Sequence, residues 1–180
     1  MKKLFLSILC VVTTTMTIVA QESWQLGLPA NSNQPKPTKV AETVSYKADI
    51  YMDNKFSQKE YYDSKTKTTA SEPAPGSFES PMLMQIDKEA GKGTIYMLDP
   101  DSKTYTKFVV NKATNAPTSE ITFVVYKDRW CSYNGSFYVD AETGITLRDN
   151  CSHTETVNIV LGEQPEEKFL IPDGYTENKF

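Results

Sequence analysis

The side chains of this chain that could do chemistry together are two of its three cysteines and its only histidine. Cys151 and His153 lie two residues apart, which would form half of a zinc site, but no second Cys/His pair supplies the remaining two ligands. A thiol nucleophile at Cys131 or Cys151 would need a base, and His153 is the only histidine that could serve as one. These residues therefore give weak support to a metal site or to thiol catalysis.

Other enzyme motifs are missing from the sequence. It has no glycine-rich phosphate loop and no G-x-S-x-G nucleophile elbow, and its carboxylates fall on polar strand faces or in turns, where nothing singles out a catalytic pair. The sequence therefore predicts a protein that is not an enzyme and that needs no cofactor or metal.

The first twenty residues predict a secretory signal peptide. Two lysines precede an apolar run from Leu4 to Val12, and the small residue Ala20 stands before the polar Gln21. A membrane anchor is the alternative, but the apolar run is well short of the ~20 residues that span a bilayer. We expect cleavage after Ala20, a periplasmic or secreted location, an extended leader over residues 21–41 and one β domain over residues 42–180.

The mature chain would be acidic and would contain two cysteines. Cleavage removes two of the 19 basic residues and none of the 23 acidic ones, so the formal charge of −4 becomes more negative. This charge argues against nucleic acid and against an electrostatic hold on anionic lipid surfaces. Because export exposes thiols to oxidation, the sequence predicts a structural disulfide between Cys131 and Cys151.

Apolar and polar residues alternate with a period of two, which predicts antiparallel strands. Residues 44–52 show the clearest alternation, and Asn134-Gly135 is a strong hairpin signal. The runs 82–86 and 94–98 are apolar on both faces and should therefore lie centrally. With no helical period of ten residues or more, the pattern predicts an all-β or β-rich α+β domain arranged as a sandwich, half-barrel or barrel.

Six segments carry a resemblance to a known family: Val44 to Met52, Tyr61 to Asp63, Met82 to Asp87, Ile95 to Tyr105, Phe137 to Arg148 and Phe169 to Tyr175. Together they resemble the outer-membrane lipoprotein carrier (LolA-like) superfamily. The resemblance covers nearly the whole mature chain, and is closest to a periplasmic branch that is a domain of unknown function. Two departures from the carriers are Lys65 and Lys67, where they typically place arginine, and the absence of a clear helix.

This resemblance implies a single strongly curved antiparallel sheet, a half-barrel, whose concave face can hold acyl chains. The expected partner is a lipid or another apolar small molecule, with a membrane-associated protein as a further option. The alternative is a structural or protein-interaction module with a filled core, since methionine suits both cavities and cores. The residues expected to line the concave face are Tyr46, Ala48, Ile50, Met52, Met84, Ile86, Tyr96 and Leu98.

If the signal peptide is removed as predicted, N-terminal sequencing of the exported protein should begin at Gln21. A mature protein that still began at Met1 would contradict the prediction, because the segment would then have stayed attached to the domain.

Overall fold

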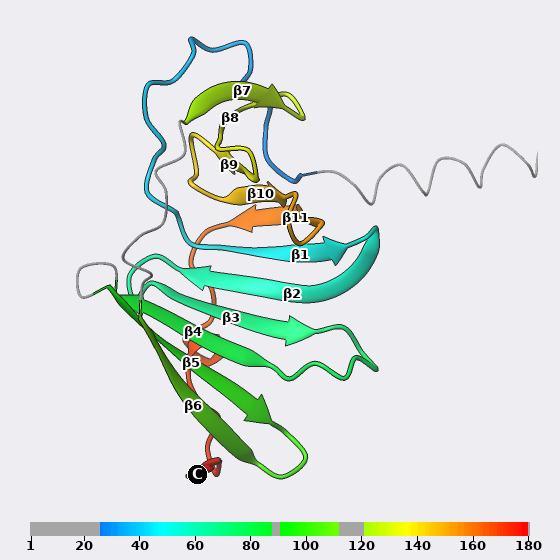
Figure 1. Ribbon diagram of the computed structural model, residues 1–180, viewed down its shortest axis with the longest axis vertical. Helices are drawn as coiled ribbons and strands as arrows, with labels where there is room; N and C mark the ends of the chain where they lie inside the picture. The colour runs from blue at the N-terminus through cyan, green and yellow to red at the C-terminus, as the bar shows by residue number, and fades with distance from the viewer. Residues whose placement is uncertain (1–25, 88–90, 112–120, 180) are drawn as a thin grey trace, which may run out of the picture.

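The computed structural model describes residues 26–87, 91–111 and 121–179, and this part of the chain is all-β (Figure 1). The predicted signal peptide lies outside these residues. The elements are β1 Tyr46–Met52, β2 Lys55–Asp63, β3 Thr68–Pro73, β4 Met82–Asp87, β5 Lys92–Asp99, β6 Thr104–Asn111, β7 Thr122–Tyr126, β8 Arg129–Tyr133, β9 Phe137–Asp140, β10 Thr146–Asp149, β11 Thr154–Leu161, a 3-10 turn η2 Glu166–Phe169, and β12 Thr176–Glu177.

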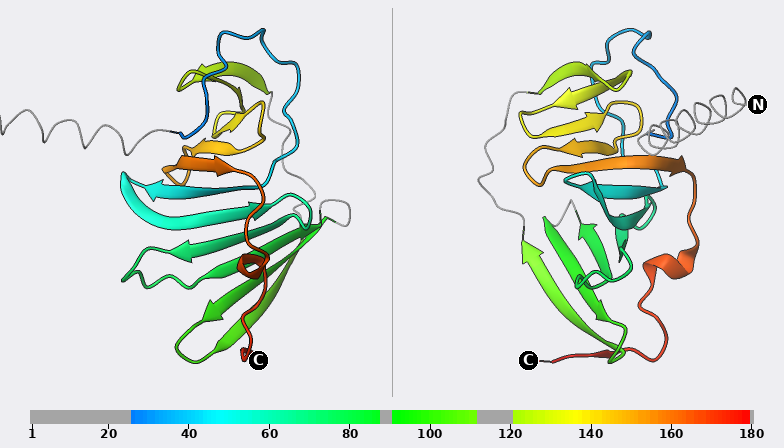
Figure 2. Two further views of the ribbon diagram at one scale, coloured as in Figure 1. Left: turned by 180° about the vertical axis from the view of Figure 1, so that it is seen from behind. Right: turned by 90° about the vertical axis from the view of Figure 1, so that its right-hand side faces the viewer.

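The strands form one 12-stranded sheet in the order β12-β6-β5-β4-β3-β2-β1-β11-β10-β9-β8-β7. Neighbouring strands are antiparallel except for β12, which runs parallel to β6. The described strands do not close into a barrel, because β7 and β12 end the order at opposite edges. The fold class predicted from the sequence, a single curved antiparallel sheet, is confirmed (Figure 2).

The strand register assigns each side chain of β2–β6 to one of two faces. Side chains paired across an antiparallel ladder share a face, and successive residues alternate. The C-terminal segment that carries η2 crosses the convex face, in front of the strands in the left panel of Figure 2. One row on the concave face is Tyr62, Thr69, Met84, Ile95 and Phe108, and the adjacent row on the convex face is Tyr61, Ala70, Leu83, Tyr96 and Lys107.

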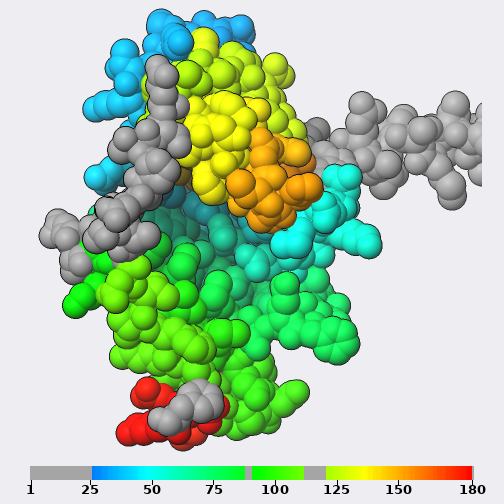
Figure 3. Space-filling view, in the orientation of Figure 1, coloured from blue at the N-terminus to red at the C-terminus, as the bar shows by residue number. Residues whose placement is uncertain are grey.

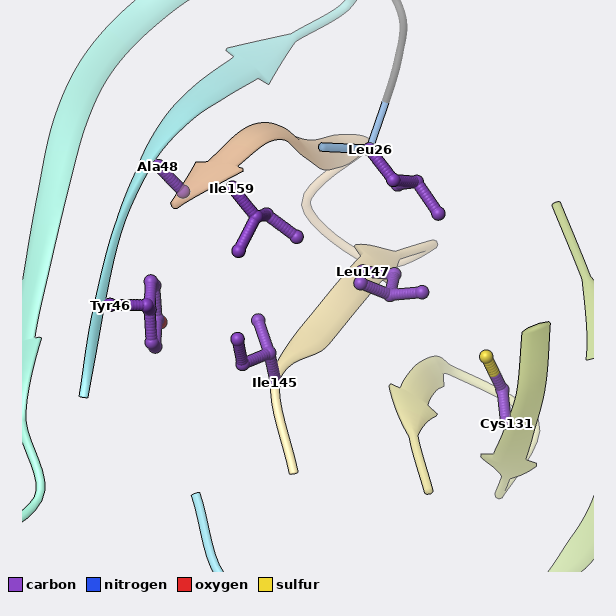
Figure 4. Packing of buried hydrophobic residues seen from close by; sticks show 7 residues of the cluster. All are labelled: Leu26, Tyr46, Ala48, Cys131, Ile145, Leu147 and Ile159. Carbon is purple, nitrogen blue, oxygen red and sulfur yellow. The ribbon is translucent and has the colours of Figure 1, made fainter. Parts of the chain in front are cut away.

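Each face has a buried hydrophobic cluster over part of its length. The larger cluster lies on the concave side, where β1 meets β8, β10 and β11 (Figure 4). The smaller one lies on the convex side, where Tyr61, Ala70 and Leu83 pack against Phe169 and Ile171 of the C-terminal segment. The members of the larger cluster are Leu26, Tyr46, Ala48, Cys131, Ile145, Leu147 and Ile159.

The described part of the leader, residues 26–41, contains no helix or strand, and it is fixed to the domain. Leu26 joins the larger cluster, and its carbonyl accepts a hydrogen bond from the Ile159 amide at 2.8 Å. The Arg129 guanidinium, 1% exposed, binds the fully buried Asp140 carboxylate through two bonds of 2.6 and 3.0 Å and also donates to the Pro29 carbonyl. This buried ion pair therefore joins β8 and β9 to the leader.

The predicted disulfide between Cys131 and Cys151 is wrong. Cys131 lies opposite Asp140 at the end of β9 and is fully buried, whereas the exposed Cys151 donates to the Ser136 hydroxyl, just before β9, at 3.3 Å. Ser136 and Asp140 are four residues apart, roughly 13 Å along a strand, which is more than a disulfide spans. Cys131 lies within β8 and Cys151 lies in the turn between β10 and β11, so the two thiols stand at opposite ends of β9.

The two thiols should differ in reactivity. Burial, with the Asp140 carboxylate nearby, raises the pKa of the Cys131 thiol to about 12, whereas Cys151 is exposed. In a chain that starts at Gln21, we expect a maleimide to label one thiol in the native state and two after denaturation. Cys151→Ser should abolish native labelling, and two unreactive cysteines under non-reducing denaturation would contradict the structure.

The buried ion pair should make a large contribution to stability. Arg129→Met leaves the Asp140 carboxylate buried without its counter-ion, so we expect the free energy of unfolding to fall by about 3–5 kcal/mol. Lys65→Met is the matched control, because it breaks an ion pair with Glu163 whose side chains are 71% and 77% exposed. Urea titrations that gave the two variants equal midpoints would contradict this role.

Candidate functional site

The concave side of β4, β5 and β6 carries an exposed apolar surface, which we call the apolar face. The register places its members side by side, with Met84 opposite Ile95 and Ile95 opposite Phe108. Several remain open to solvent: Ile86 is 40% exposed and Phe108 44%. Contiguous exposed apolar surfaces usually mark a binding site. The apolar face consists of Met82, Met84, Ile86, Ile95, Met97, Phe108 and Val110.

One end of the apolar face is hollowed into a cavity of about 410 Å³. Met84, Ile86 and Val110 form its apolar wall, and Gly93 lies between the last two in the register. A Cβ atom on Gly93 would stand only 3.0 Å from a Val110 methyl group, so the glycine leaves room for this cavity. Its volume falls in the ~300–1,000 Å³ range of small-molecule sites.

A second, more polar cavity of about 270 Å³ adjoins the first. It lies where the turn between β2 and β3 faces the loop between β9 and β10, and Figure 3 shows the hollow between these two halves of the sheet. Ile86 lines both cavities, so they adjoin at this side chain. The other lining residues are Thr43, Tyr46, Tyr62, Lys67, Thr69, Gly144 and Thr146.

Two backbone features shape the polar cavity. Gly144 has a φ of +69°, and a Cβ atom there would stand 2.7 Å from the Ala41 carbonyl oxygen, so only glycine lets the leader pass this close. The passage brings Thr43 to the cavity wall, where its hydroxyl donates to the Gly144 carbonyl at 3.1 Å. On the opposite wall the Lys67 carbonyl accepts a hydrogen bond from the Ile86 amide at 3.3 Å.

A half-buried carboxyl separates the filled part of the concave side from the apolar face. The Tyr46 hydroxyl donates to the Glu60 carboxyl at 2.6 Å. Burial raises the pKa of Glu60, and the bond from Tyr46 opposes part of that rise. Burial and the nearby Glu60 raise the pKa of Tyr46 as well, so its hydroxyl stays protonated.

A larger cavity, about 720 Å³, lies on the convex side beneath the C-terminal segment. Its apolar floor includes Leu83, Tyr96 and Phe169, and a polar rim surrounds it. Lys65 and Glu163 form an ion pair of 2.5 Å at this rim. The convex cavity shares no lining residue with the two cavities of the concave side.

The structure does not bring the residues expected to bind ligand together. Met84 and Ile86 belong to the apolar face, whereas Tyr46 and Ala48 are buried in the filled cluster. Of the remaining β1 residues, Ile50 is buried and Met52 is 41% exposed. Tyr96 and Leu98 lie on the convex face, where Tyr96 lines the large cavity. The expected set therefore does not form one surface.

Sequence reasoning missed Ile95, Phe108 and Val110 as concave residues. Residues 94–98 are apolar at both the odd-numbered and the even-numbered positions. The sequence therefore does not tell which of the two sets of side chains faces the concave side. The decisive fact is that Met84 pairs with Ile95, which turns Tyr96 to the other side. In β6, Val109 and Val110 are both apolar, so the sequence does not tell which of the two faces the concave side.

No family model matches this chain, and no curated protein matches its sequence. The resemblance to the lipoprotein carriers therefore stays a prediction. Within the described residues, no helix has the length and apolarity needed to cross a membrane. In the same part of the chain, no group of three or more His, Cys, Asp or Glu side chains is placed to hold a metal ion.

Glu60 should make stability depend on pH. Because the pKa of Glu60 is higher in the folded state than the ordinary value of 4.5, folding favours the protonated form. The contribution of Glu60 to the free energy of unfolding is therefore fully present below pH 4.5, and it is lost as the pH rises through the raised pKa. Glu60→Gln keeps an acceptor for the Tyr46 hydroxyl but does not titrate. We therefore expect the urea midpoint of the parent to fall over this pH range and that of the variant not to show this fall.

The exposed Glu79→Gln is the control, and it should follow the parent at every pH. A constant difference in midpoint between Glu60→Gln and the parent across the mildly acidic range would contradict the assignment.

Proposed function

We propose that this chain is an exported binding protein that holds an acyl chain or a similar apolar ligand on the concave side of its sheet. The observation that carries the proposal is the apolar face of β4–β6, which remains exposed although the neighbouring part of the concave side is filled. A binding role, rather than catalysis, fits a surface of this composition.

The energetics favour a long apolar chain. Burial of one CH₂ group contributes about 0.8 kcal/mol, so an acyl chain lying along several side chains would bind without needing a charge. Met82, Met84 and Met97 contribute flexible, polarizable side chains that adapt to ligands of different shape. The cavity bounded by Met84 and Val110 offers an enclosed end for the chain.

The predicted signal peptide supports a periplasmic or secreted location, where lipids and other apolar molecules need a carrier in water. The motifs shared with the lipoprotein carrier superfamily support the same role. The curved open sheet is the architecture that this resemblance implies, although the covering segments here are a leader and a C-terminal tail instead of helices.

A protein-interaction module is the second candidate function, and the edge of the sheet favours it. Strand β12 pairs with β6 only at Thr104 and Tyr105. Within the described residues, the rest of the outer edge of β6 has no strand partner, and Phe108 and Val110 stand next to it. A strand of another protein could add to such an edge.

Two neighbouring valines of β6 give a matched test. Val110 is 43% exposed on the concave face, and Val109 is 61% exposed on the convex face. Val110→Glu places a charge in the apolar cavity, so we expect it to weaken binding of the neutral probe N-phenyl-1-naphthylamine by roughly tenfold or more. Val109→Glu should bind like the parent, as judged by fluorescence titration.

The protein purified from its native host should also carry a lipid detectable by mass spectrometry. If the parent neither bound the probe nor carried a lipid, the acyl-chain proposal would fail and the interaction module would be favoured. Equal weakening by the two substitutions would place the ligand elsewhere than the concave side.

A further inference from the structure

We infer that the ligand is an anionic amphiphile, whose carboxylate or phosphate head lies in the polar cavity beside Lys67 while its tail lies on the apolar face. The inference rests on the proposed function and adds the chemical class of the ligand. Its basis is that the two cavities of the concave side meet at Ile86 yet differ in the groups that line them.

The path from head to tail is short. Ile86 lines both cavities, and its amide donates to the carbonyl of Lys67, so the lysine lies directly beside the apolar face. Thr69 of the polar cavity pairs with Met84 of the apolar cavity in the ladder between β3 and β4. A single molecule that lies across Ile86 can therefore contact both cavities.

The polar cavity offers hydrogen-bond donors suited to an anion. Within the described part of the chain, the Lys67 ammonium and the hydroxyls of Tyr62, Thr69 and Thr146 have no ion-pair or hydrogen-bond partner, although all four residues line the cavity. Burial, Asp63 and Glu42 raise the pKa of Tyr62, so its hydroxyl remains a donor. Charged donors form the stronger hydrogen bonds to an anion.

The charge in the cavity lining agrees with an anionic ligand, while the carboxylates of Asp63 and Glu42 act on Tyr62 from outside that lining. Among the described residues that line the cavity there is no aspartate or glutamate, and Lys67 is the only charged one. Glu60 is close, but the Tyr46 hydroxyl already donates to its carboxyl. In the same turn, Lys65 differs from Lys67 because it forms an ion pair with Glu163 at the rim of the convex cavity. Substitution of Lys67 therefore tests the inference, and the same substitution of Lys65 is its control.

The test is displacement of N-phenyl-1-naphthylamine from the exported protein by four ligands with the same saturated tail. These are palmitate, hexadecyl phosphate, hexadecanol and hexadecyltrimethylammonium, each used below its micellar concentration. We expect the parent to bind at least one anion about tenfold more tightly than hexadecanol. Lys67→Gln should reduce that preference to about twofold or less, and Lys65→Gln should keep it.

The outcomes separate the inference from the proposed function. Preference for palmitate or for hexadecyl phosphate supports it and tells which head group is recognised. If the probe and hexadecanol bind but the anions have no advantage, or if Lys67→Gln retains the advantage, the head-group inference is overturned and the acyl-chain function stands. Preference for the trimethylammonium ligand overturns it as well, and failure of the probe and all four ligands to bind overturns both.

Discussion

An open sheet has two faces and two edges, and a single layer of strands cannot bury them with its own side chains. Every other feature of this protein follows from that constraint. The strands of the first and last parts of the chain lie side by side, since β1 pairs with β11, and the sheet bends so that part of its concave side closes on itself. The segments outside the strands then cover part of what remains.

The coverage is uneven, and this unevenness creates the candidate site. On the concave side, Leu26 of the leader completes the cluster with Ile145 and Leu147, and the buried pair of Arg129 and Asp140 fixes the leader in place. On the convex side, Phe169 and Ile171 cover Leu83. Among the described residues, no comparable segment covers the concave side of β4–β6, and apolar side chains stay exposed there.

The concave side therefore changes character from one end to the other. It is filled near Ala48, polar near Lys67 and Thr69, and apolar from Met84 to Phe108. A ligand that matched this order would be amphipathic, with its head toward β2 and β3 and its tail toward β6. The same order explains why a uniformly apolar lining, expected from the pattern of residues 44–52 and 82–98, does not describe the site.

The sequence by itself determined the strands and the all-β class, because a half-buried strand requires an alternation such as that of residues 46–50 and a tight hairpin requires a pair such as Asn134-Gly135. It also predicted that Met84 and Ile86 share a face, because they are two residues apart in one strand. Only the tertiary structure decided that Ile95, and not Tyr96, lies on the same face as Met84 and Ile86. When both faces of a strand are apolar, the register with the neighbouring strand determines which side chains face inward. The predicted disulfide between Cys131 and Cys151 was wrong for a related reason. The sequence places both cysteines near strands, but it does not tell which ends of those strands lie together. Burial of Leu26 in the core and the polar cavity beside Lys67 likewise depend on contacts between segments about a hundred residues apart in the chain, which no local pattern records.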